Sequence, residues 1–468
     1  MSLRRTKLVC TIGPAAIDLV DELVATGMDV ARINFSHGTP EEHAAAGDRI
    51  RSAAVAAWRT VAILADLPGP KIRLGELEEE AVDLEAGASF DLHPEPWPHG
   101  GPDGAHISRP MADELVRGDR ILLADGAAEL RVVSTDAVIH TEVVRGGTIR
   151  PHAGVNVPAE RLRGPSLTER DRRDAPRAIE IGADWLAQSF VRTGADIAEL
   201  RALIGAEGPP IVAKIETRPA VDDFDAICEA ADAVMIARGD LGVELPFEEV
   251  PILQKQLVRR ALDLGVPTIV ATQMLESMVT SPRPTRAEAS DVANAIFDGA
   301  DAIMLSAETA IGRYPVLAAE AAVRIAELCA SHGSELLPHG APPQIDSDAG
   351  ALAYAATALA DRTDDVAAIA CYTRSGRTAR MLASLRPRTP IIAFSPDAGV
   401  VRRLALVHGV DARGCVPPPE HGARLDLMAW LLDEADVLPD GSAVVLVAST
   451  ATPGTGPNLM ELRRLPSD

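Results

Sequence analysis

Short apolar runs recur along the chain, and each is followed by a polar or glycine-containing break and then a stretch rich in alanine, leucine, glutamate and arginine. Near-continuous apolar strands that alternate with helices are typical of a parallel sheet covered on both faces. The runs of strand length begin at Lys7, Val30, Val61, Trp185, Ile211, Ala233, Thr268 and Ala302. Eight such units in succession predict a closed (β/α)8 barrel, the TIM barrel.

A segment too long for a barrel helix separates the third run from the fourth. It is rich in glycine and proline and contains DRILLADG, AELRVVS and AVIHTEVV, whose alternating patterns predict antiparallel strands. We therefore expect a small β-barrel lid domain over residues 70–167, inserted at the mouth of a TIM barrel formed by residues 1–69 and 168–335. A linker rich in proline, glycine and serine, Ser331 to Gly350, precedes a predicted C-terminal open α/β domain over residues 345–468.

The composition narrows the choice of partners. Lys and Arg number 45 against 68 Asp and Glu, so the formal net charge is −23, whereas nucleic acids and anionic membranes are bound by basic surface. No run approaches the roughly 18 apolar residues of a membrane span, and the N-terminal segment lacks a signal-peptide core. We expect a cytoplasmic protein without either partner. The 5 cysteines are scattered, which favours reduced thiols over disulfides or a zinc site.

Polar side chains close most of the eight runs. In a TIM barrel the chemistry lies at the carboxyl ends of the strands, so these side chains are expected to meet at one mouth. Arg32, Arg73 and Lys214 form a cationic set beside the carboxylates of Glu216 and Asp240. Two carboxylates suit Mg²⁺, and cations around that ion suit a phosphate. The sequence predicts a metal-assisted site for phosphoryl transfer.

The alternative interpretation is a buried ion-pair network that only stabilises the barrel. Such a network explains one pair well, but it explains less well why so many charges gather at one end. The chain has no GxxxxGK[ST] loop and no strand-linked GxGxxG. A nucleotide would therefore be held by side chains and metal rather than by a glycine-rich loop.

The residues at these positions resemble those of the pyruvate kinase family, over nearly the whole chain. The resemblance is carried by RRTKLVCTIGPA, GMDVARINFSHG, KIE from Lys214, VMIARGDLGVELP, ATQMLESM and SPRPTRAEASDVANAIFDGADAIMLSAETAIGRYP. It implies transfer of the phosphoryl group of phosphoenolpyruvate to ADP, which gives pyruvate and ATP in the last step of glycolysis. The family fold, a barrel with an inserted lid and a C-terminal α/β domain, agrees with the predicted layout.

The resemblance also implies roles for single residues. Lys214 and Arg32 would bind the transferring phosphoryl group, while Gly239, Asp240 and Thr272 would hold the substrate. Thr272 and Ser306 are candidates for protonating the enolpyruvate. Mg²⁺ or Mn²⁺ would be bound by Glu216 and Asp240. The residues implied to contact the nucleotide are Asn34, Phe35, Ser36, His37 and Arg73.

Many family members need K⁺, which the resemblance assigns to Asn34, Ser36, Asp66 and the position of Leu67. Here the adjoining motif reads DLPGPKIRLG, with Lys71 where those members carry a glutamate. A fixed ammonium can replace the electrostatic role of a monovalent cation, so we expect activity without K⁺. A second departure is Ala153, at a position that often carries a nucleotide-contacting lysine, and it leaves the preferred nucleoside diphosphate open.

The TRSGRT segment follows an apolar strand and precedes a helix, an arrangement that can bind an anion but also fits an ordinary helix cap. In the family this loop binds phosphorylated effectors, so we expect allosteric activation through Thr373, Arg374, Ser375, Gly376, Arg377 and Thr378. Thr285 and Glu288 form a predicted capping box in a region that lies at a subunit interface in the family. The resemblance therefore implies a homotetramer.

Two other functions remain open on the sequence. A different metal-dependent barrel enzyme, such as a lyase or aldolase acting on an enolpyruvate or 2-oxo acid, would have no ADP for a lid and Arg73 to enclose. A catalytically silent protein that binds a phosphorylated metabolite would have no reason to keep the charge set of Arg32, Lys214, Glu216, Asp240 and Thr272.

Overall fold

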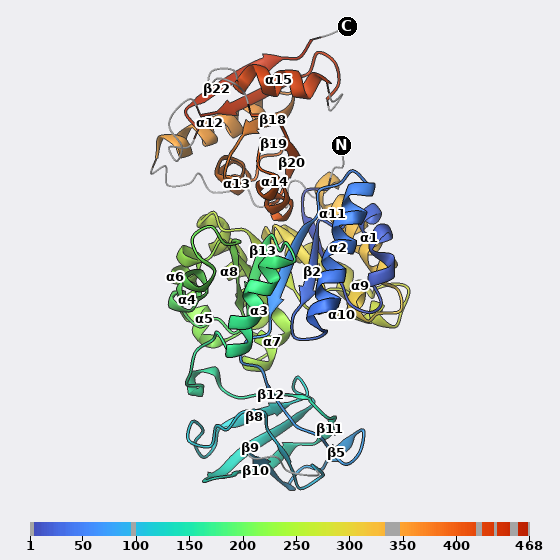
Figure 1. Ribbon diagram of the computed structural model, residues 1–468, viewed down its shortest axis with the longest axis vertical. Coiled ribbons are helices and arrows are strands. Elements are labelled where there is room, and N and C mark those ends of the chain that lie inside the picture. Colours follow the sequence, from blue (N-terminus) through green and yellow to red (C-terminus); the bar gives the residue numbers. More distant parts are fainter. Residues whose placement is uncertain are drawn as a thin grey trace.

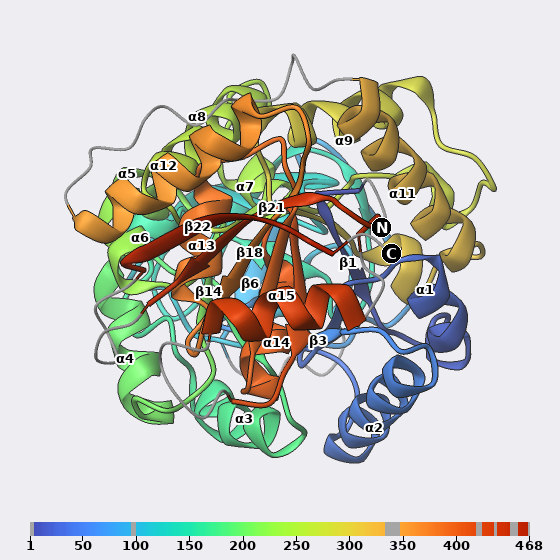
Figure 2. The same ribbon diagram turned by 90° about the horizontal axis from the view of Figure 1, so that it is seen from above.

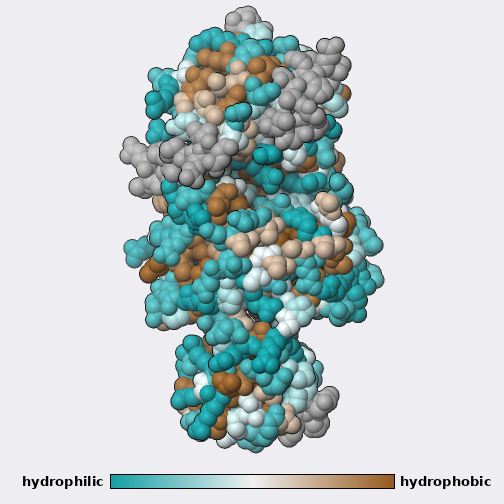
Figure 3. All heavy atoms as spheres, turned by 90° about the vertical axis from the view of Figure 1, so that its left-hand side faces the viewer, coloured by the Kyte–Doolittle hydropathy of each residue, from teal (hydrophilic) through white to brown (hydrophobic). Residues whose placement is uncertain are grey.

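The computed structural model of the protein describes residues 4–94, 100–332, 347–417, 424–434, 438–449 and 457–466. Three domains are stacked along the long axis, with the barrel in the middle, the inserted domain at one end and the C-terminal domain at the other (Figure 1). In the space-filling view the inserted domain forms a separate lobe, and hydrophilic and hydrophobic residues are interspersed over the visible face (Figure 3). The predicted order of domains along the chain is the order observed.

All eight predicted runs are strands of one closed parallel barrel, in the order β1-β17-β16-β15-β14-β13-β3-β2. Because successive strand residues point to opposite faces, one set, including Val30, Leu64 and Met235, fills the barrel interior, and the other set packs beneath the helices. The strands are β1 (Lys7–Thr11), β2 (Val30–Asn34), β3 (Ala62–Leu67), β13 (Trp185–Gln188), β14 (Ile211–Ile215), β15 (Ala233–Ala237), β16 (Thr268–Ala271) and β17 (Ala302–Leu305).

Helices surround the barrel, and several begin with side-chain caps. The capping box predicted at Thr285 and Glu288 is present at the start of α9 (Arg286–Asp298). Among the described residues, no helix is long and apolar enough to cross a membrane. The other barrel helices are α1 (Val20–Thr26), α2 (Pro40–Ala56), α3 (Glu169–Glu180), α4 (Gly194–Ile204), α5 (Arg218–Asp222), α6 (Phe224–Ala230), α7 (Arg238–Glu244), α8 (Val250–Asp263), α10 (Ala307–Ala310) and α11 (Pro315–His332).

The inserted domain is a small β domain, as predicted, but its described strands do not pair into one closed barrel. They form a seven-stranded sheet, β4-β12-β8-β9-β10-β6-β7, and a separate pair, β11-β5, around one apolar core. The alternating sequence pattern specifies which face of each strand is buried, but not which edges pair. The strands are β4 (Ile72–Arg73), β5 (Val82–Leu84), β6 (Ser89–His93), β7 (Gly104–His106), β8 (Arg120–Leu123), β9 (Ala128–Thr135), β10 (Ile139–Arg145), β11 (Gly147–Ile149) and β12 (Gly154–Asn156).

The C-terminal domain is the predicted open α/β fold, with the strand order β20-β19-β18-β21-β22. All adjacent pairs are parallel except β21 and β22. Of the predicted linker, residues 333–346 lie outside the described residues. The elements are α12 (Asp348–Arg362), β18 (Val366–Tyr372), α13 (Arg377–Ser384), β19 (Ile391–Ser395), α14 (Ala398–Arg403), β20 (Val410–Gly414), α15 (Arg424–Glu434), β21 (Ala443–Ala448) and β22 (Leu459–Arg464).

The C-terminal domain covers the amino ends of the barrel strands, as the view from above shows (Figure 2). Its central contact is a buried ion pair between Arg386 and Asp301, with Nη2 2.9 Å from Oδ2 and both side chains 6% exposed. Asp301 also accepts hydrogen bonds from the backbone amides of Thr268 and His408. The opposite mouth, where the strands end, is thereby left to face the inserted domain.

The Asp301 carboxylate should be a major determinant of stability at this interface. Asp301→Asn leaves the buried Arg386 guanidinium without its counter-charge, so we expect the free energy of unfolding to fall by about 3–5 kcal/mol. Urea denaturation followed by intrinsic fluorescence measures the change. Asp225→Asn is the control, because Asp225 pairs with Arg260 on the surface and should cost less than about 1 kcal/mol. Equal losses in the two variants would contradict this account.

Candidate active site

At the carboxyl ends of β2, β3 and β14, one carboxylate holds two cations. Arg32 Nε donates a hydrogen bond of 2.7 Å to Asp66 Oδ2, and Lys214 Nζ lies 3.3 Å from Asp66 Oδ1. Lys214 also lies 2.9 Å from Glu216 Oε1 and donates a 2.7 Å hydrogen bond to Ser189 Oγ. The side chains of Arg32 and Lys214 are each only 11% exposed. The two cations are thus held at fixed positions.

These contacts keep the buried groups charged. Burial lowers the pKa of Lys214, but Asp66 and Glu216 outweigh burial and hold that pKa above its ordinary value. Burial also raises the pKa of Asp66, and here Lys214 and Arg32 outweigh it and hold the pKa below the usual range. At neutral pH the site therefore presents an ammonium and a guanidinium around a single carboxylate.

A second carboxylate group lies beside this cluster. Burial raises the pKa of Glu216 above its ordinary value, Lys214 counteracts burial in part, and Asp240 raises the pKa further. Glu216 Oε2 accepts a 2.8 Å hydrogen bond from the Phe190 amide, and Asp240, at the start of α7, is 24% exposed. Two neighbouring carboxylates, one of which raises the pKa of the other, form a donor set suited to a divalent cation.

This donor set is small. The described residues contain no group of three or more His, Cys, Asp or Glu side chains arranged around one point. Mg²⁺ is commonly bound by one or two carboxylates, with water and substrate oxygens completing its coordination. Glu216 and Asp240 therefore fit Mg²⁺ better than a metal that requires a complete protein cage.

Two hydroxyls lie at the ends of the next strands. Thr272, after β16, accepts a 2.7 Å hydrogen bond from the Gly239 amide through Oγ1. Its φ is +67° and that of Gln273 is +55°; such left-handed conformations cost non-glycine residues about 1–3 kcal/mol each. Ser306, after β17, has a buried Oγ without a hydrogen-bond partner among the described residues.

The backbone around both hydroxyls is tied to one buried carboxylate. Glu308 Oε2 accepts a 2.7 Å hydrogen bond from the Ser306 amide, and Oε1 accepts one of 2.9 Å from the Leu275 amide. Glu308 is fully buried. The loop that carries Thr272 and the loop that carries Ser306 are therefore fixed relative to each other.

A cavity of about 480 Å³ separates the barrel mouth from the inserted domain. A smaller adjoining pocket is lined by Glu216 and Asp240 and shares Lys71 with this cavity. Arginine and lysine are the side chains that bind phosphate oxygens most strongly. The cavity therefore suits a polyphosphate beside the carboxylate pair. Its basic lining residues are Lys71, Arg73, Arg109, Arg163, Arg170 and Arg192.

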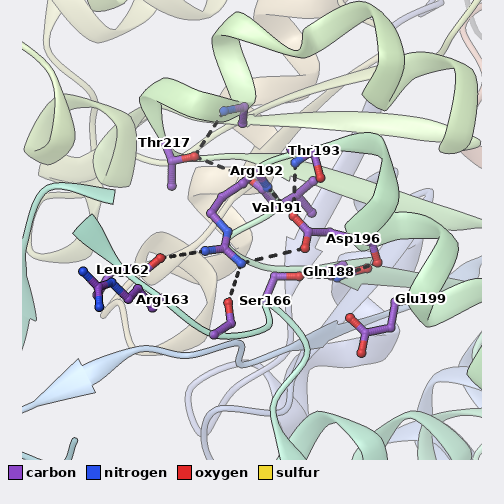
Figure 4. A network of polar contacts seen from close by, with 12 residues as sticks. Leu162, Arg163, Ser166, Gln188, Val191, Arg192, Thr193, Asp196, Glu199 and Thr217 are labelled. Atoms are coloured by element: carbon purple, nitrogen blue, oxygen red, sulfur yellow. Dashed lines mark hydrogen bonds and ion pairs between the residues drawn. The ribbon is translucent and has the colours of Figure 1, made fainter. Parts of the chain in front are cut away.

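The segment that returns the chain from the inserted domain to the barrel is fixed by Arg192 (Figure 4). Its Nη1 donates to the Leu162 carbonyl at 2.9 Å and its Nη2 to the Gly164 carbonyl at 2.6 Å. Asp196 holds the loop before α4 by accepting from the Arg192 and Thr193 amides. Arg192 thus attaches this return segment to the barrel at the edge of the cavity.

Some of the residues predicted to contact a nucleotide line the cavity, and the Phe35 side chain does not. Ser36 and Arg73 line the cavity, and Asn34 accepts a 3.1 Å hydrogen bond from the Ser36 amide. Burial, followed by Arg73, lowers the pKa of His37. The Phe35 ring does not face the cavity, because it is buried in the hydrophobic core and contacts His43. The Phe35 backbone is also engaged, because its N–H donates to the Asp66 carbonyl at 3.0 Å and its carbonyl accepts from Arg170 Nη2 at 2.6 Å.

The sequence interpretation missed several features of the site. Ser189 closes the fourth apolar run, so its strand-end position was a usable signal for a residue that contacts Lys214. Asp66 was expected only as a K⁺ ligand, whereas here it pairs with both active-site cations. The remaining basic residues of the cavity come from loops and helix starts, which periodicity does not place. They are Arg109, Arg163, Arg170 and Arg192.

Comparisons with known proteins give a consistent result. Residues 3–319 match the family described as "Pyruvate kinase, barrel domain", and residues 350–462 match "Pyruvate kinase, alpha/beta domain". The pyruvate kinase of Geobacillus stearothermophilus is 44% identical over 473 residues, covering 98% of this chain and 80% of that protein. That of Mycobacterium tuberculosis H37Rv is 41% identical over 481 residues, 99% of each. A solved pyruvate kinase structure from Cryptosporidium parvum matches with a TM-score of 0.89 at 32% identity, covering 99% of this chain and 97% of that one.

The shared carboxylate leads to a prediction about Lys214. In Asp66→Asn the strongest opposition to burial is lost, so the pKa of Lys214 should fall. Each unit of decrease makes the unprotonated amine about tenfold more abundant at a fixed pH below the pKa. Acetylation of Lys214 by acetic anhydride between pH 8 and 10, quantified by mass spectrometry, measures this fraction.

Asp184→Asn is the matched control for this experiment. Asp184 is equally buried on the barrel but pairs with Arg51 and Arg402 instead, so its loss should leave Lys214 labelling unchanged. Unchanged labelling in Asp66→Asn as well would show that Asp66 does not set the charge state of Lys214.

Proposed function

We infer the roles of the residues at the barrel mouth from one premise: the chain belongs to the pyruvate kinase family. It is a phosphotransferase that transfers the phosphoryl group of phosphoenolpyruvate to ADP, giving pyruvate and ATP. This assignment of roles rests on one observation. The cations of Arg32 and Lys214 are held at fixed positions beside the carboxylates of Glu216 and Asp240.

Lys214 and Arg32 bind the phosphoryl group as it passes from one oxygen to the other. Phosphoryl transfer depends mainly on alignment and on charge stabilisation, which two pre-positioned cations supply. All three donors of Lys214 are directed at Asp66, Glu216 and Ser189. We assign the Glu216 contact as the one exchanged for a phosphoryl oxygen, because Asp66 remains bound to Arg32.

Glu216 and Asp240 would hold Mg²⁺ or Mn²⁺, which supplies positive charge to the phosphoryl oxygens when bound. The Gly239 amide and the Asp240 region at the start of α7 would hold the substrate together with Thr272. The Gly239 amide donates to Thr272 Oγ1 in this structure, so it would exchange that contact for the substrate carboxylate, an anionic group suited to a helix start.

Enolpyruvate must then gain a proton at carbon, and we assign this step to the hydroxyls of Thr272 and Ser306. The support is their placement at adjacent strand ends and the buried, unpartnered Oγ of Ser306. Glu308 supports both loops without being proposed to contact the substrate.

ADP would occupy the cation-lined cavity between barrel and lid. Ser36 and Arg73 line it, and Asn34, the Phe35 backbone and His37 border Ser36 along the chain. Arg73 belongs to β4 of the inserted domain, where it donates to the His152 carbonyl at 3.1 Å, whereas Ser36 belongs to the barrel. Lid and barrel would therefore both contact the nucleotide.

The ammonium of Lys71 supports activity without K⁺. Lys71 lines the same cavity as Ser36, and its Nζ is 3.7 Å from Asp240 Oδ1. Asp66, which is implied as a K⁺ ligand, already pairs with Arg32 and Lys214. The side chains of Lys71, Arg32 and Lys214 thus supply positive charge near the residues implied as K⁺ ligands.

Initial rates of pyruvate formation test this proposal. With phosphoenolpyruvate, ADP and Mg²⁺, the rate in a K⁺-free tetramethylammonium buffer should be within about twofold of the rate in KCl. Lys71→Glu removes the ammonium and should make turnover depend on KCl, because the missing charge must then come from solution. Negligible wild-type turnover without K⁺, restored by KCl, would discard the Lys71 argument while leaving the activity itself established.

We propose that the TRSGRT loop binds a phosphorylated effector. Thr373 Oγ1 accepts a 3.0 Å hydrogen bond from the Gly376 amide, and Gly376 has a φ of +82° before α13. These contacts also fit a helix cap, so support for an effector comes from the exposed Arg374 and Ser375 and from the family. Thr378 is buried at the same turn.

A single substitution separates the two interpretations of this loop. Arg377→Ala removes a cation that the effector phosphate would bind, so activation by candidate sugar phosphates or AMP should be lost while basal turnover stays within about twofold. Activation curves at subsaturating phosphoenolpyruvate measure the response. An unchanged response in a correctly folded variant would reject the loop as the effector site.

We further propose a homotetramer located in the cytoplasm. The support for assembly is the family and the exposed apolar side chains on the barrel flank, such as Phe247 and Ile311, which are 80% and 66% exposed. The support for location is that the substrates are glycolytic metabolites.

A further inference from the structure

Arg238 connects three elements of the barrel to the turn that carries Thr272. It begins α7 directly after β15 and is 9% exposed. Its Nη2 donates to the Thr272 carbonyl at 2.7 Å and to the Gln273 carbonyl at 3.1 Å. These are the two consecutive residues with left-handed backbone, at φ +67° and +55°.

The guanidinium is itself held from the outside. Its Nη1 lies 2.5 Å from Asp291 Oδ2 on α9 and donates to Gln254 Oε1 on α8 at 3.3 Å. Gln254 is held in turn by a 2.9 Å hydrogen bond to Asp298. A planar donor group fixed at one edge by α8 and α9 therefore presents its other edge to the strained turn.

The residue types of the turn do not by themselves favour a left-handed backbone. Threonine is β-branched, and neither Thr272 nor Gln273 is a residue type that favours positive φ. In the left-handed conformation the carbonyls of Thr272 and Gln273 both accept hydrogen bonds from the Arg238 guanidinium. An extended backbone would lose this interaction. Gly239 follows Arg238 in the chain. Arg238 therefore also positions the Gly239 amide, which donates to Thr272 Oγ1.

We propose that Arg238 is a positioning residue for the proton-transfer half of the reaction. It holds the Thr272 to Gln273 turn and so aims the Thr272 hydroxyl, while Lys214 and Arg32, on other strands, retain the phosphoryl group. The proposal rests on the proton-transfer role proposed for Thr272. In that step enolpyruvate gains one proton at C3, supplied through the hydroxyl and replaced from water.

Two assays separate the two halves of the reaction. Formation of ATP from phosphoenolpyruvate and ADP reports phosphoryl transfer. Exchange of the pyruvate C3 hydrogens for deuterium in D₂O with Mg²⁺ and ATP, followed by ¹H NMR, reports proton transfer. Thermal unfolding of each variant reports stability. A residue that only stabilises the fold would lower both activities by a similar factor.

The variants are Arg238→Met, Gln273→Gly and the combination of the two. We expect Arg238→Met to slow C3 exchange at least tenfold and to slow ATP formation by a smaller factor. Glycine adopts positive φ without strain, so the double variant should recover at least threefold of the lost exchange. Gln273→Gly alone should stay within twofold of the wild type, since its side chain is exposed.

Two further variants complete the design. Arg238→Lys keeps the positive charge, and it replaces Arg238→Met if the methionine variant does not fold. It should slow C3 exchange by a smaller factor than Arg238→Met. Adding Gln273→Gly should again restore part of the lost exchange. Arg218→Met is the matched control, because Arg218 begins α5 and pairs with Glu249, away from the turn. It should leave the ratio of exchange to ATP formation unchanged.

The outcomes distinguish this proposal from the function on which it rests. If Thr272→Val leaves C3 exchange intact, the role of Thr272 is wrong, and the proposal for Arg238 is overturned with it. If Thr272→Val abolishes exchange but the Arg238 variants slow both activities equally, or Gln273→Gly gives no recovery, Thr272 keeps its role and Arg238 is only structural.

Discussion

The active site depends on one buried carboxylate that is shared by two cations. Asp66 is 1% exposed and pairs with both Arg32 and Lys214. A buried ion pair contributes little net stability, because the loss of hydration offsets the attraction between the charges. What the carboxylate provides is geometry: without it, two cations on different strands would repel each other and turn toward water. Held by Asp66, they remain side by side with their charge available to a phosphoryl group.

The fold keeps this arrangement rigid from both ends of the barrel. On one side the C-terminal domain covers the amino ends of the strands through the Arg386 and Asp301 pair. On the other side the strands end in the charged cluster, and the inserted domain lies across it with Arg192 attaching its return segment to the barrel. The inserted domain is thus placed over the mouth, where substrates must enter and products must leave.

Much of this architecture could be predicted from sequence, because buried parallel strands have a strong apolar signature and barrel chemistry follows their ends. All eight strands and the charged residues Arg32, Lys214, Glu216 and Asp240 were located in this way. The pairing of the lid strands was not, since alternation does not specify which edges meet. Nor was the left-handed turn at Thr272 and Gln273, because it contains no glycine or asparagine to signal it and its carbonyls bind Arg238, which is distant in the sequence. Arg163 and Arg170 reach the cavity from a loop and a helix start, where no periodicity applies.

The central claim is that Asp66 fixes Arg32 and Lys214 so that both bind the phosphoryl group, beside a metal ion held by the Glu216 and Asp240 carboxylates. A crystal structure with phosphoenolpyruvate and Mn²⁺, in which anomalous scattering locates the metal, tests it most directly. The account predicts manganese bound by Glu216 and Asp240, with the phosphoryl oxygens in contact with Lys214 and Arg32. Manganese bound away from both carboxylates, or a phosphoryl group that contacts neither cation, would contradict it.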